Sequence, residues 1–415
     1  MKKQTTSVWD VIVIGGGPAG LMAATTAAAR GKSVLVLEKN PSPGKKLLIT
    51  GGGRCNVTNN KPDIRTMLAQ YGLAGKFLFS AFVQHPVPDT IAWFAQRGVP
   101  FAEENEGRLF PVTNTAQTIY DTLLADCKKT GVVIRSKSTV QTLATTPAGI
   151  KVTLATGETF ATTSCIVATG GTSRPETGST GDGFMWLRNL GHTIVPNNYA
   201  LVPMISSDAW VALVSGVSLS GIKITLFSDN KKHSSQVGKL LFTHVGLSGP
   251  TILNMSKTVG ELLTHSTVTL RLNLLPALDA GALKQTLKER LATSSNKKIR
   301  NGLAELLPAA LVSPLLTIAG IDPDTVCHSV RTAERTTIAH LISALPISIS
   351  GLQGADKAVI SSGGIPPGEI NFKTMASRVV PGLYVVGDVL DINRPTGGYG
   401  LQLCWTTGYV AGTHC

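Results

Sequence analysis

The sequence lacks the cysteine patterns that mark a disulfide framework or a zinc site. Only six of its 415 residues are cysteine, and no two of them form a Cys-x-x-Cys pair. No group of cysteines and histidines has the spacing of zinc ligands either. Single cysteines scattered along a chain are typical of a reducing compartment. The sequence therefore predicts a cytoplasmic protein without a metal centre.

Long apolar segments are also missing, with one exception near the N-terminus. Residues 11–29, VIVIGGGPAGLMAATTAAA, have the length of a signal peptide or a short membrane span. Asp10 stands directly before them, and three glycines with Pro18 would interrupt a continuous helix. We therefore expect strand, turn and helix in this segment, and no membrane association.

Acidic residues are few: 25 Asp and Glu stand against 38 Lys and Arg, which gives a net charge of +13. A basic protein attracts anionic partners such as nucleotides, acidic substrates, nucleic acid or a membrane surface. No long run of Lys and Arg is interleaved with aromatic residues, so a stable complex with nucleic acid is not expected. The composition, 43% hydrophobic and 15% charged, is that of a globular protein.

The first 40 residues have the pattern of a strand–turn–helix–strand unit. Residues 11–14 are all β-branched, as in a strand that is buried on both faces. Residues 21–30 are rich in alanine and end at Gly31, which is a common helix stop. Residues 33–37, SVLVL, form a second buried strand. This order predicts the opening of a doubly wound α/β domain.

Between the first strand and the helix lies a Gly-x-Gly-x-x-Gly motif at Gly15, Gly17 and Gly20. In dinucleotide-binding domains the first glycine allows a tight turn, the second lets the backbone approach a diphosphate, and the third lets the helix pack on the strand. The helix then presents its positive end to the phosphates. Glu38 ends the second strand, where a carboxylate can bind ribose hydroxyls. No second such motif follows a later strand, so a separate NAD(P) domain is not expected.

Motifs in the second half of the chain indicate which dinucleotide is bound. The apolar segment PGLYVVGDV ends in Gly387 and Asp388, and the glycine-rich TGGYG then leads into a helix. In FAD enzymes of the glutathione-reductase class, such an aspartate contacts the ribityl chain, and the helix N-terminus points at the flavin pyrimidine. CIVATGG at residues 165–171 resembles a signature that passes near the same cofactor. The motifs predict FAD, and no residue is placed as a covalent anchor.

The middle of the chain differs in pattern from both ends. Residues 61–130 look mainly helical, residues 200–275 contain short alternating strands, and residues 280–345 are again helical. No internal repeat is present. We predict a discontinuous α/β domain that is interrupted by an inserted β domain and an inserted helical domain. The boundaries are 1–195 and 346–415 for the first, 196–275 for the second and 276–345 for the third.

Two segments carry a resemblance to a known family. TGGGRCNVTN at residues 50–59, with EINFKTMASRVVPGLYVVGDVLDINRPTGGYGLQ at residues 369–402, resembles the BaiN-like or aminoacetone-oxidase-like NAD(P)/FAD-dependent oxidoreductases. The resemblance covers nearly the whole chain. It implies a three-layered, Rossmann-like FAD-binding domain with β-barrel-like and helical insertions, and it links some members to the reduction of carbon–carbon double bonds in enone-type substrates. The chain departs from the family at Gly400, where asparagine is usual, and at Phe372 and Ala376.

The resemblance also implies that the second glycine run returns along the cofactor. Gly51 to Gly53 would let the backbone lie against the flavin or the diphosphate, and a tight structural turn is the alternative. Arg54 could contact phosphate or flavin carbonyl oxygens, and Asn56 could supply a neutral hydrogen bond. Cys55 is either a packed, inert residue or a redox group beside the flavin. The absence of a second cysteine nearby in sequence favours the packed residue.

Candidate catalytic residues stand beside glycines that let a ligand come close. They are His244, near Ser248 in FTHVGLSGP, and Tyr399, after two glycines; a packing role is the alternative for each. The predicted FAD contacts are Gly15, Gly17, Ala19, Gly20, Glu38, Lys39, Gly52, Gly53, Arg54, Asn56, Val140, Thr169, Gly170, Gly387, Asp388, Gly397, Gly398 and Tyr399.

Together these features predict an FAD-dependent oxidoreductase. Its flavin would take a hydride from NAD(P)H, docked transiently, or from an organic donor, and pass it to a small or medium substrate, with an activated C=C bond as the preferred target. Three alternatives remain: an amine oxidase that uses O₂, an RNA-binding or RNA-modifying flavoprotein, and a flavin-carrying redox sensor without turnover. The sequence indicates neither the substrate nor the oligomeric state.

Overall fold

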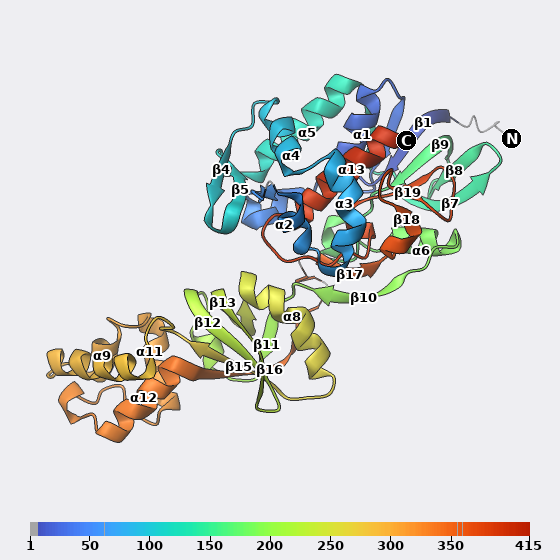
Figure 1. Ribbon diagram of the computed structural model, residues 1–415. Coiled ribbons are helices and arrows are strands. Elements are labelled where there is room, and N and C mark those ends of the chain that lie inside the picture. Colours follow the sequence, from blue (N-terminus) through green and yellow to red (C-terminus); the bar gives the residue numbers. More distant parts are fainter. Residues whose placement is uncertain (1–6, 62, 355, 359) are drawn as a thin grey trace. The chain divides into compact units, whose positions relative to one another are not determined.

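The computed structural model describes residues 7–61, 63–354, 356–358 and 360–415, and the chain forms two compact units (Figure 1). The first unit combines the residues up to Ala200 with those after Gly354, and the inserted unit spans Leu201–Gly354. Each has its own buried core. Within the described residues, no helix has both the length and the apolar character that crossing a bilayer requires.

A parallel sheet forms the centre of the first unit. Its strands run in the order β6 (Val133–Arg135), β2 (Val34–Leu37), β1 (Ser7–Ile14), β9 (Thr159–Val167) and β20 (Leu383–Val385). Residues 11–14 and 34–37 are fully buried, as expected for strands that are covered on both faces. The edge beyond β20 is extended by antiparallel β19 (Ala376–Ser377) and β18 (Ile370–Asn371), and β7 (Val140–Thr146) and β8 (Gly149–Leu154) add a hairpin to β9.

Helices and a small second sheet surround this sheet. Residues 61–130, which looked mainly helical, contain helices but also two strands of a three-stranded sheet, which the sequence pattern did not predict. The helices are α1 (Pro18–Ala29), α2 (Ile64–Ala69), α3 (Gly75–Gln84), α4 (Val87–Ala95), α5 (Ala116–Thr130), α6 (Asp182–Asn189) and α13 (Tyr399–His414). The small sheet joins β3 (Thr58–Asn59), β5 (Arg108–Pro111) and β4 (Phe101–Glu104), and β10 (Val195–Ala200) pairs with β17 (Ile360–Gly364).

The inserted unit is a closed antiparallel barrel with helices packed against it. Around the barrel the strands are β11 (Met204–Ser206), β14 (Gly246–Ser248), β13 (Lys231–Thr243), β12 (Ser218–Ser228), β15 (Val268–Asn273) and β16 (Leu345–Leu352). The helices are α7 (Trp210–Leu213), α8 (Pro250–Leu263), α9 (Ala280–Thr293), α10 (Ile299–Leu303), α11 (Ala309–Ile318) and α12 (Thr332–Ala344), and they share one core with the barrel.

The predicted fold class, a Rossmann-like α/β domain with a barrel-like and helical insertion, is confirmed. One segment is placed differently. Residues 346–352, assigned from sequence to the α/β domain, form most of β16 and pair with β15 and β11 of the barrel. The remaining predicted domain boundaries stay predictions.

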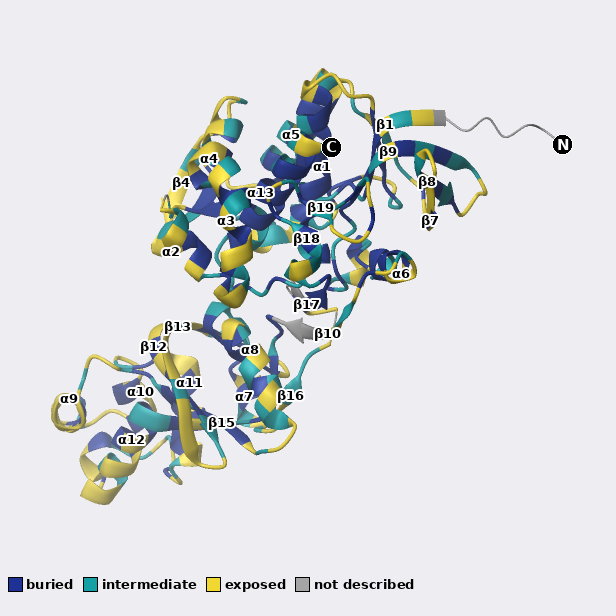
Figure 2. Cartoon of the chain, turned by 45° about the vertical axis from the view of Figure 1, so that its right-hand side comes forward, coloured by how far each residue is buried: buried dark blue, intermediate teal, exposed yellow. Residues whose placement is uncertain are grey.

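Two glycines bring α13 into close contact with α1, and both helices are largely buried (Figure 2). A Cβ added at Gly408 would lie 2.4 Å from the carbonyl oxygen of Ala19, and one at Gly412 would lie 2.4 Å from that of Ala23. Because residue numbers rise together along the contact, the two helices run in the same direction. Both therefore point their N-termini toward the same side of the unit.

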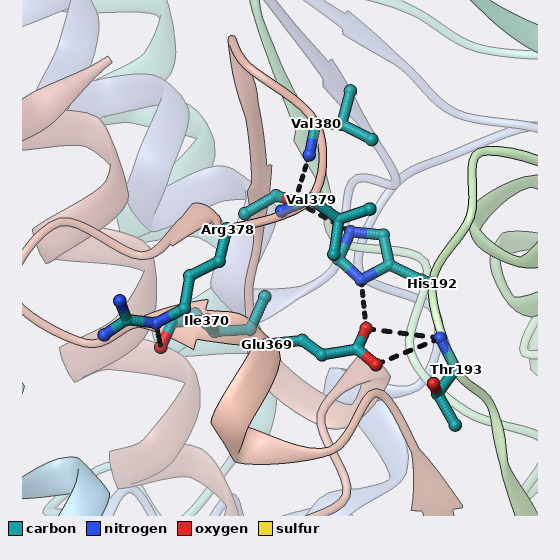
Figure 3. Close-up of polar contacts among 8 residues, drawn as sticks. His192, Thr193, Glu369, Ile370, Arg378, Val379 and Val380 are labelled. Carbon is teal, nitrogen blue, oxygen red and sulfur yellow. Dashed lines mark hydrogen bonds and ion pairs between the residues drawn. The ribbon is translucent and has the colours of Figure 1, made fainter.

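A buried histidine fastens the β18–β19 edge to the segment after α6 (Figure 3). The Nδ1 of His192 lies 2.6 Å from Oε2 of Glu369, and its Nε2 lies 2.8 Å from Oγ of Ser377. The order is that of a hydrolase triad. However, Ser377 Oγ already accepts the N–H groups of Val379 and Val380, so its lone pairs are occupied. The cluster therefore has a structural role, since it joins the segment after α6 to the β18–β19 edge.

The helix contact predicts the effect of one methyl group. Gly408→Ala should lower the free energy of unfolding by about 1–3 kcal/mol, because the helices must separate to admit the Cβ. Chemical denaturation of both proteins measures the difference. Gly368→Ala is the control, since a Cβ there meets nothing within 4 Å. Equal losses in the two variants would show that the close contact is not needed.

Candidate cofactor-binding site

The three glycines between β1 and α1 serve different purposes. Gly15 has a φ of +105°, and its Cβ would lie 2.5 Å from the carbonyl oxygen of Ala168. A Cβ at Gly20 would lie 2.0 Å from the carbonyl oxygen of Gly15, so this glycine lets α1 pack on the turn. Gly17, at the N-cap of α1, has nothing within 4 Å of its added Cβ. This open position leaves room for a diphosphate at the positive end of the helix.

The end of β2 lies beside the same turn. The buried carboxylate of Glu38 accepts hydrogen bonds from the backbone N–H groups of Gly16, at 2.9 Å, and Asn40, at 2.8 Å. Each carboxylate oxygen keeps capacity for a further donor such as a ribose hydroxyl. The ammonium group of the neighbouring Lys39 pairs with Asp182 at 2.8 Å instead, and Val140 is packed in the core.

At the end of β9, Thr169 and Gly170 also face this turn. The backbone of Ala168 and Thr169 lies against Gly15, and Gly170 has a φ of +73°. The hydroxyl oxygen of Thr169 is buried without a hydrogen-bond partner among the residues the structure describes. This hydroxyl lies against α6, because a Cβ added at Gly183 would lie 2.2 Å from it.

The glycines before α13 contact the segment that follows the glycine run of residues 51–53. A Cβ at Gly398 would lie 2.4 Å from the backbone carbon of Thr58, and Asn59 donates its side-chain N–H to the carbonyl oxygen of Gly397 at 3.0 Å. With its amide oriented to satisfy its neighbours, Asn56 accepts the N–H of Gly398 at 3.0 Å. Asn56 thus joins the segment after β2 to the N-terminus of α13.

This glycine run is a left-handed turn. Gly51, Gly52 and Gly53 have φ values of +57°, +69° and +85°, and Cβ atoms at Gly52 and Gly53 would be free of close contacts. Cys55 also has a positive φ, +61°, and its side chain is fully buried. Burial raises the pKa of the Cys55 thiol to about 12, although a hydrogen bond with Thr50 works against this. At neutral pH the group is a thiol, which supports the packed, inert interpretation.

The structure places Arg54 on the small sheet. Its guanidinium pairs with Glu104, donates to Asn114 and lies 4.1 Å from the centre of the Phe110 ring. Glu104 thus balances the positive charge of Arg54, and the Phe110 ring covers its guanidinium. A contact between Arg54 and the cofactor stays a prediction.

A buried arginine, which the sequence analysis did not identify, pairs with the predicted ribityl-binding aspartate. The guanidinium of Arg394 forms an ion pair with Asp388 and donates to the carbonyl oxygen of Ile392 at 2.8 Å. Burial works against its charge, but Asp388 together with Cys404 and Tyr71 raises the pKa of Arg394 on balance. A Cβ at Gly400 would lie 3.2 Å from Nε of Arg394. The departure from asparagine at position 400 therefore lies directly beside this arginine.

Lys46 adds a second cation. It precedes the left-handed glycine turn, and its ammonium donates to Oγ of Ser173 at 2.9 Å. Burial lowers its pKa, while the charge of Asp388 partly offsets this effect. Two basic side chains, Lys46 and Arg394, therefore accompany the one carboxylate of Asp388. Such a cluster is suited to an anionic group or to negative charge that develops on a flavin.

The two catalytic candidates lie in different units. Tyr399 begins α13, and its buried ring packs edge-on against Tyr71, 6.3 Å between centres. Burial raises the pKa of Tyr399, so it keeps its proton at neutral pH. His244 lies in the inserted unit on the tight turn between β13 and β14, and it is exposed. The alternative of a packed core histidine is therefore wrong, and both catalytic roles stay predictions.

Comparison with known proteins gives the family. The model of the HI0933-like protein Rossmann domain matches residues 9–414. The chain belongs to this family. The resemblance seen in the motifs is confirmed, and the chain is an FAD-dependent oxidoreductase.

Relatives match it along its whole length. The chain is 30% identical over 411 residues to the ribosomal RNA dihydrouridine synthase of Escherichia coli, covering 97% of this chain and 96% of that protein. It is 28% identical over 403 residues to the 3-dehydro-bile acid delta(4,6)-reductase of Clostridium scindens, covering 96% and 97%. The fold is similar to that of the 3-ketosteroid-delta4-(5alpha)-dehydrogenase from Rhodococcus jostii RHA1, with a TM-score of 0.55, 15% identity and coverage of 100% and 98%.

The site residues fit FAD in this family member. The open Gly17 position and the basic side chains of Lys46 and Arg394 each suit one part of that cofactor. When bound, FAD supplies hydride chemistry, and the chain binds and orients it.

A pair of glycine variants separates cofactor binding from folding. Gly17→Ala should weaken FAD binding at least tenfold, because its methyl group enters the space beside the helix N-terminus. Its unfolding free energy without FAD should change by no more than about 1 kcal/mol. Gly20→Ala should instead destabilise the fold, since its Cβ strikes Gly15. FAD titration and denaturation measure both. Tight FAD binding by stable Gly17→Ala protein would contradict this assignment.

Variants of the adjacent Lys45 and Lys46 test whether the Lys46 ammonium affects the flavin. In Lys46→Met protein the midpoint potential of bound FAD should become more negative, because reduction adds negative charge that the ammonium no longer stabilises. Lys45→Met is the matched control, since Lys45 is exposed and bonds to the carbonyl oxygen of Glu176 at 2.7 Å. Spectroscopic redox titration gives both potentials. Equal potentials in the two variants would place Lys46 outside the electrostatic environment of the flavin.

Proposed function

We propose that the protein is an FAD-dependent reductase of a carbon–carbon double bond that is conjugated to a carbonyl group. The observation that carries the proposal is its full-length similarity to two relatives with different substrates but one chemistry. The base of uridine and the ring system of a 3-oxo steroid both contain a C=C bond beside a carbonyl. Saturation of such a bond needs a hydride on one carbon and a proton on the other.

The residues of this chain have defined tasks in that reaction. The first turn of α1 binds the diphosphate, Glu38 binds ribose and Asp388 orients the ribityl chain. Lys46 and Arg394 stabilise negative charge on the reduced cofactor. The hydroxyl of Tyr399 holds a proton at neutral pH and is the candidate donor to the substrate. NAD(P)H docks transiently as the hydride donor.

Uridine in ribosomal RNA is the second candidate substrate. Two observations favour it: the net charge of +13 and the 30% identity with the Escherichia coli synthase over nearly the whole chain. An RNA substrate needs phosphate contacts, which a basic surface provides. A small enone needs none.

Stepwise flavin spectroscopy under anaerobic conditions tests the function. NADPH or NADH should bleach the flavin band, and either a 3-oxo-4-ene steroid or an unmodified ribosomal RNA fragment should then restore it. The product should be two hydrogens heavier than the substrate by mass spectrometry. A flavin that is reduced only by amines would support the oxidase instead. A reduced flavin that no conjugated substrate reoxidises would contradict the proposal.

A further inference from the structure

The barrel carries a basic outer face that the flavin site does not explain. On β15, inward Val268, Leu270 and Leu272 are buried, and the residues between them point outward. The same alternation holds on β12, where Ile222, Ile224 and Leu226 are buried. The outward residues of β12, β13 and β15 include Lys223, Phe227, Lys232, Lys239 and Arg271, which we call the outer basic face.

Strand pairing brings these residues together. Phe227 is opposite Lys232 on β13 and opposite Thr269 on β15, while Arg271 is opposite Thr225. Neighbouring strands are about 4.8 Å apart, and two residues along a strand span about 7 Å. Positive groups on three adjacent strands therefore lie within reach of one extended polyanion.

Arg271 lies over an aromatic ring of this face. Its guanidinium carbon is 4.1 Å from the centre of the Phe227 ring. A guanidinium can bind a phosphate with two hydrogen bonds or stack on a base. Beside it, the hydroxyls of Thr225 and Ser235 lie 2.7 Å apart and offer further polar contacts.

The charges of this face are not neutralised by ion pairs. Among the described residues of the inserted unit, the ion pairs lie within residues 290–334, where Lys297, Lys298 and Arg300 contact Glu305 or Asp324. Two acidic residues of the barrel have backbone or hydroxyl partners of their own: Asp229 at the hairpin turn accepts from Thr267, and Asp208 accepts from the N–H of Ser348. No ion pair among the described residues therefore engages the positive groups of this face.

We propose that the outer basic face of β12, β13 and β15 is an RNA-binding surface. This inference rests on the second candidate substrate of the proposed function, an RNA that carries the target uridine. A sheet face with basic, aromatic and hydroxyl side chains is how several barrel folds hold oligonucleotides. The face would bind the RNA backbone and leave selection of the base to the flavin site.

Two triple variants that remove equal charge test the surface. The first is Lys223→Gln, Lys232→Gln and Lys239→Gln, and the control is Lys297→Gln, Lys298→Gln and Arg300→Gln. Binding of a fluorescent ribosomal RNA fragment is measured by anisotropy over a range of salt concentrations. The first variant should bind at least tenfold more weakly at low salt, and the slope of log Kd against log salt should fall by about 2. The control should change by about twofold or less.

The guanidinium is tested separately. Arg271→Lys keeps the charge but loses the planar fork, so RNA binding should weaken severalfold while the salt slope stays within one unit of wild type. Every variant should keep its flavin spectrum and its activity on a small enone, which shows that the fold and the flavin site are intact.

Each contrary result has a distinct meaning. Equal losses of RNA affinity in the two triple variants would overturn the proposal, because the net charge of the protein alone would then explain binding. Wild-type protein that reduces a small enone but does not bind RNA at low salt would remove the RNA substrate and leave the reductase in place. Binding to vesicles that contain anionic lipid, without binding to RNA, would assign the face to a membrane and also overturn the proposal.

Discussion

The close contact between α1 and α13 determines how the cofactor site is built. The two helices run in the same direction, and Gly408 of α13 lies beside Ala19 in the first turn of α1. Gly408 is nine residues from the start of α13 and Ala19 is one residue from the start of α1, so the N-terminus of α13 lies about 12 Å beyond that of α1. Two positive helix ends are thus held a fixed distance apart; we propose one for the diphosphate and one for the flavin ring. A Cβ at either glycine of the contact would push the two helices apart.

Electrostatics at the site depends on residues far apart in the chain. Lys46 precedes the left-handed glycine turn, whereas Arg394 and Asp388 belong to the loop before α13. Gly400 lies against the buried guanidinium, so a side chain at this position would press on Arg394. The ion pair of Arg394 and Asp388 is thus packed against the first turn of α13.

Local sequence was sufficient for some parts of this architecture and insufficient for others. Gly15, Gly17 and Gly20 identified β1, α1 and their turn, because each position demands a backbone that other residues cannot adopt or a space they would fill. Most of strand β16 was assigned to the α/β domain, although it belongs to the barrel. Its alternating pattern fits a strand of either domain, and only its pairing with β15 and β11 distinguishes them. The ion pair of Arg394 has no local signal, because its environment is created by tertiary packing. For the same reason the exposure of His244 could not be read from its apolar neighbours.

The order of the chain has a consequence for synthesis. The glycine turns of residues 15–20 and 51–53 leave the ribosome long before α13, which must pack on α1 to complete the same site. Between them emerges a barrel-and-helix unit with a hydrophobic core of its own, which can fold as soon as residue 354 is free. Until α13 arrives, the apolar surface of α1 stays uncovered. We therefore expect a stage during synthesis in which the inserted unit is already folded. At that stage the apolar surface of α1 is still exposed and prone to aggregation.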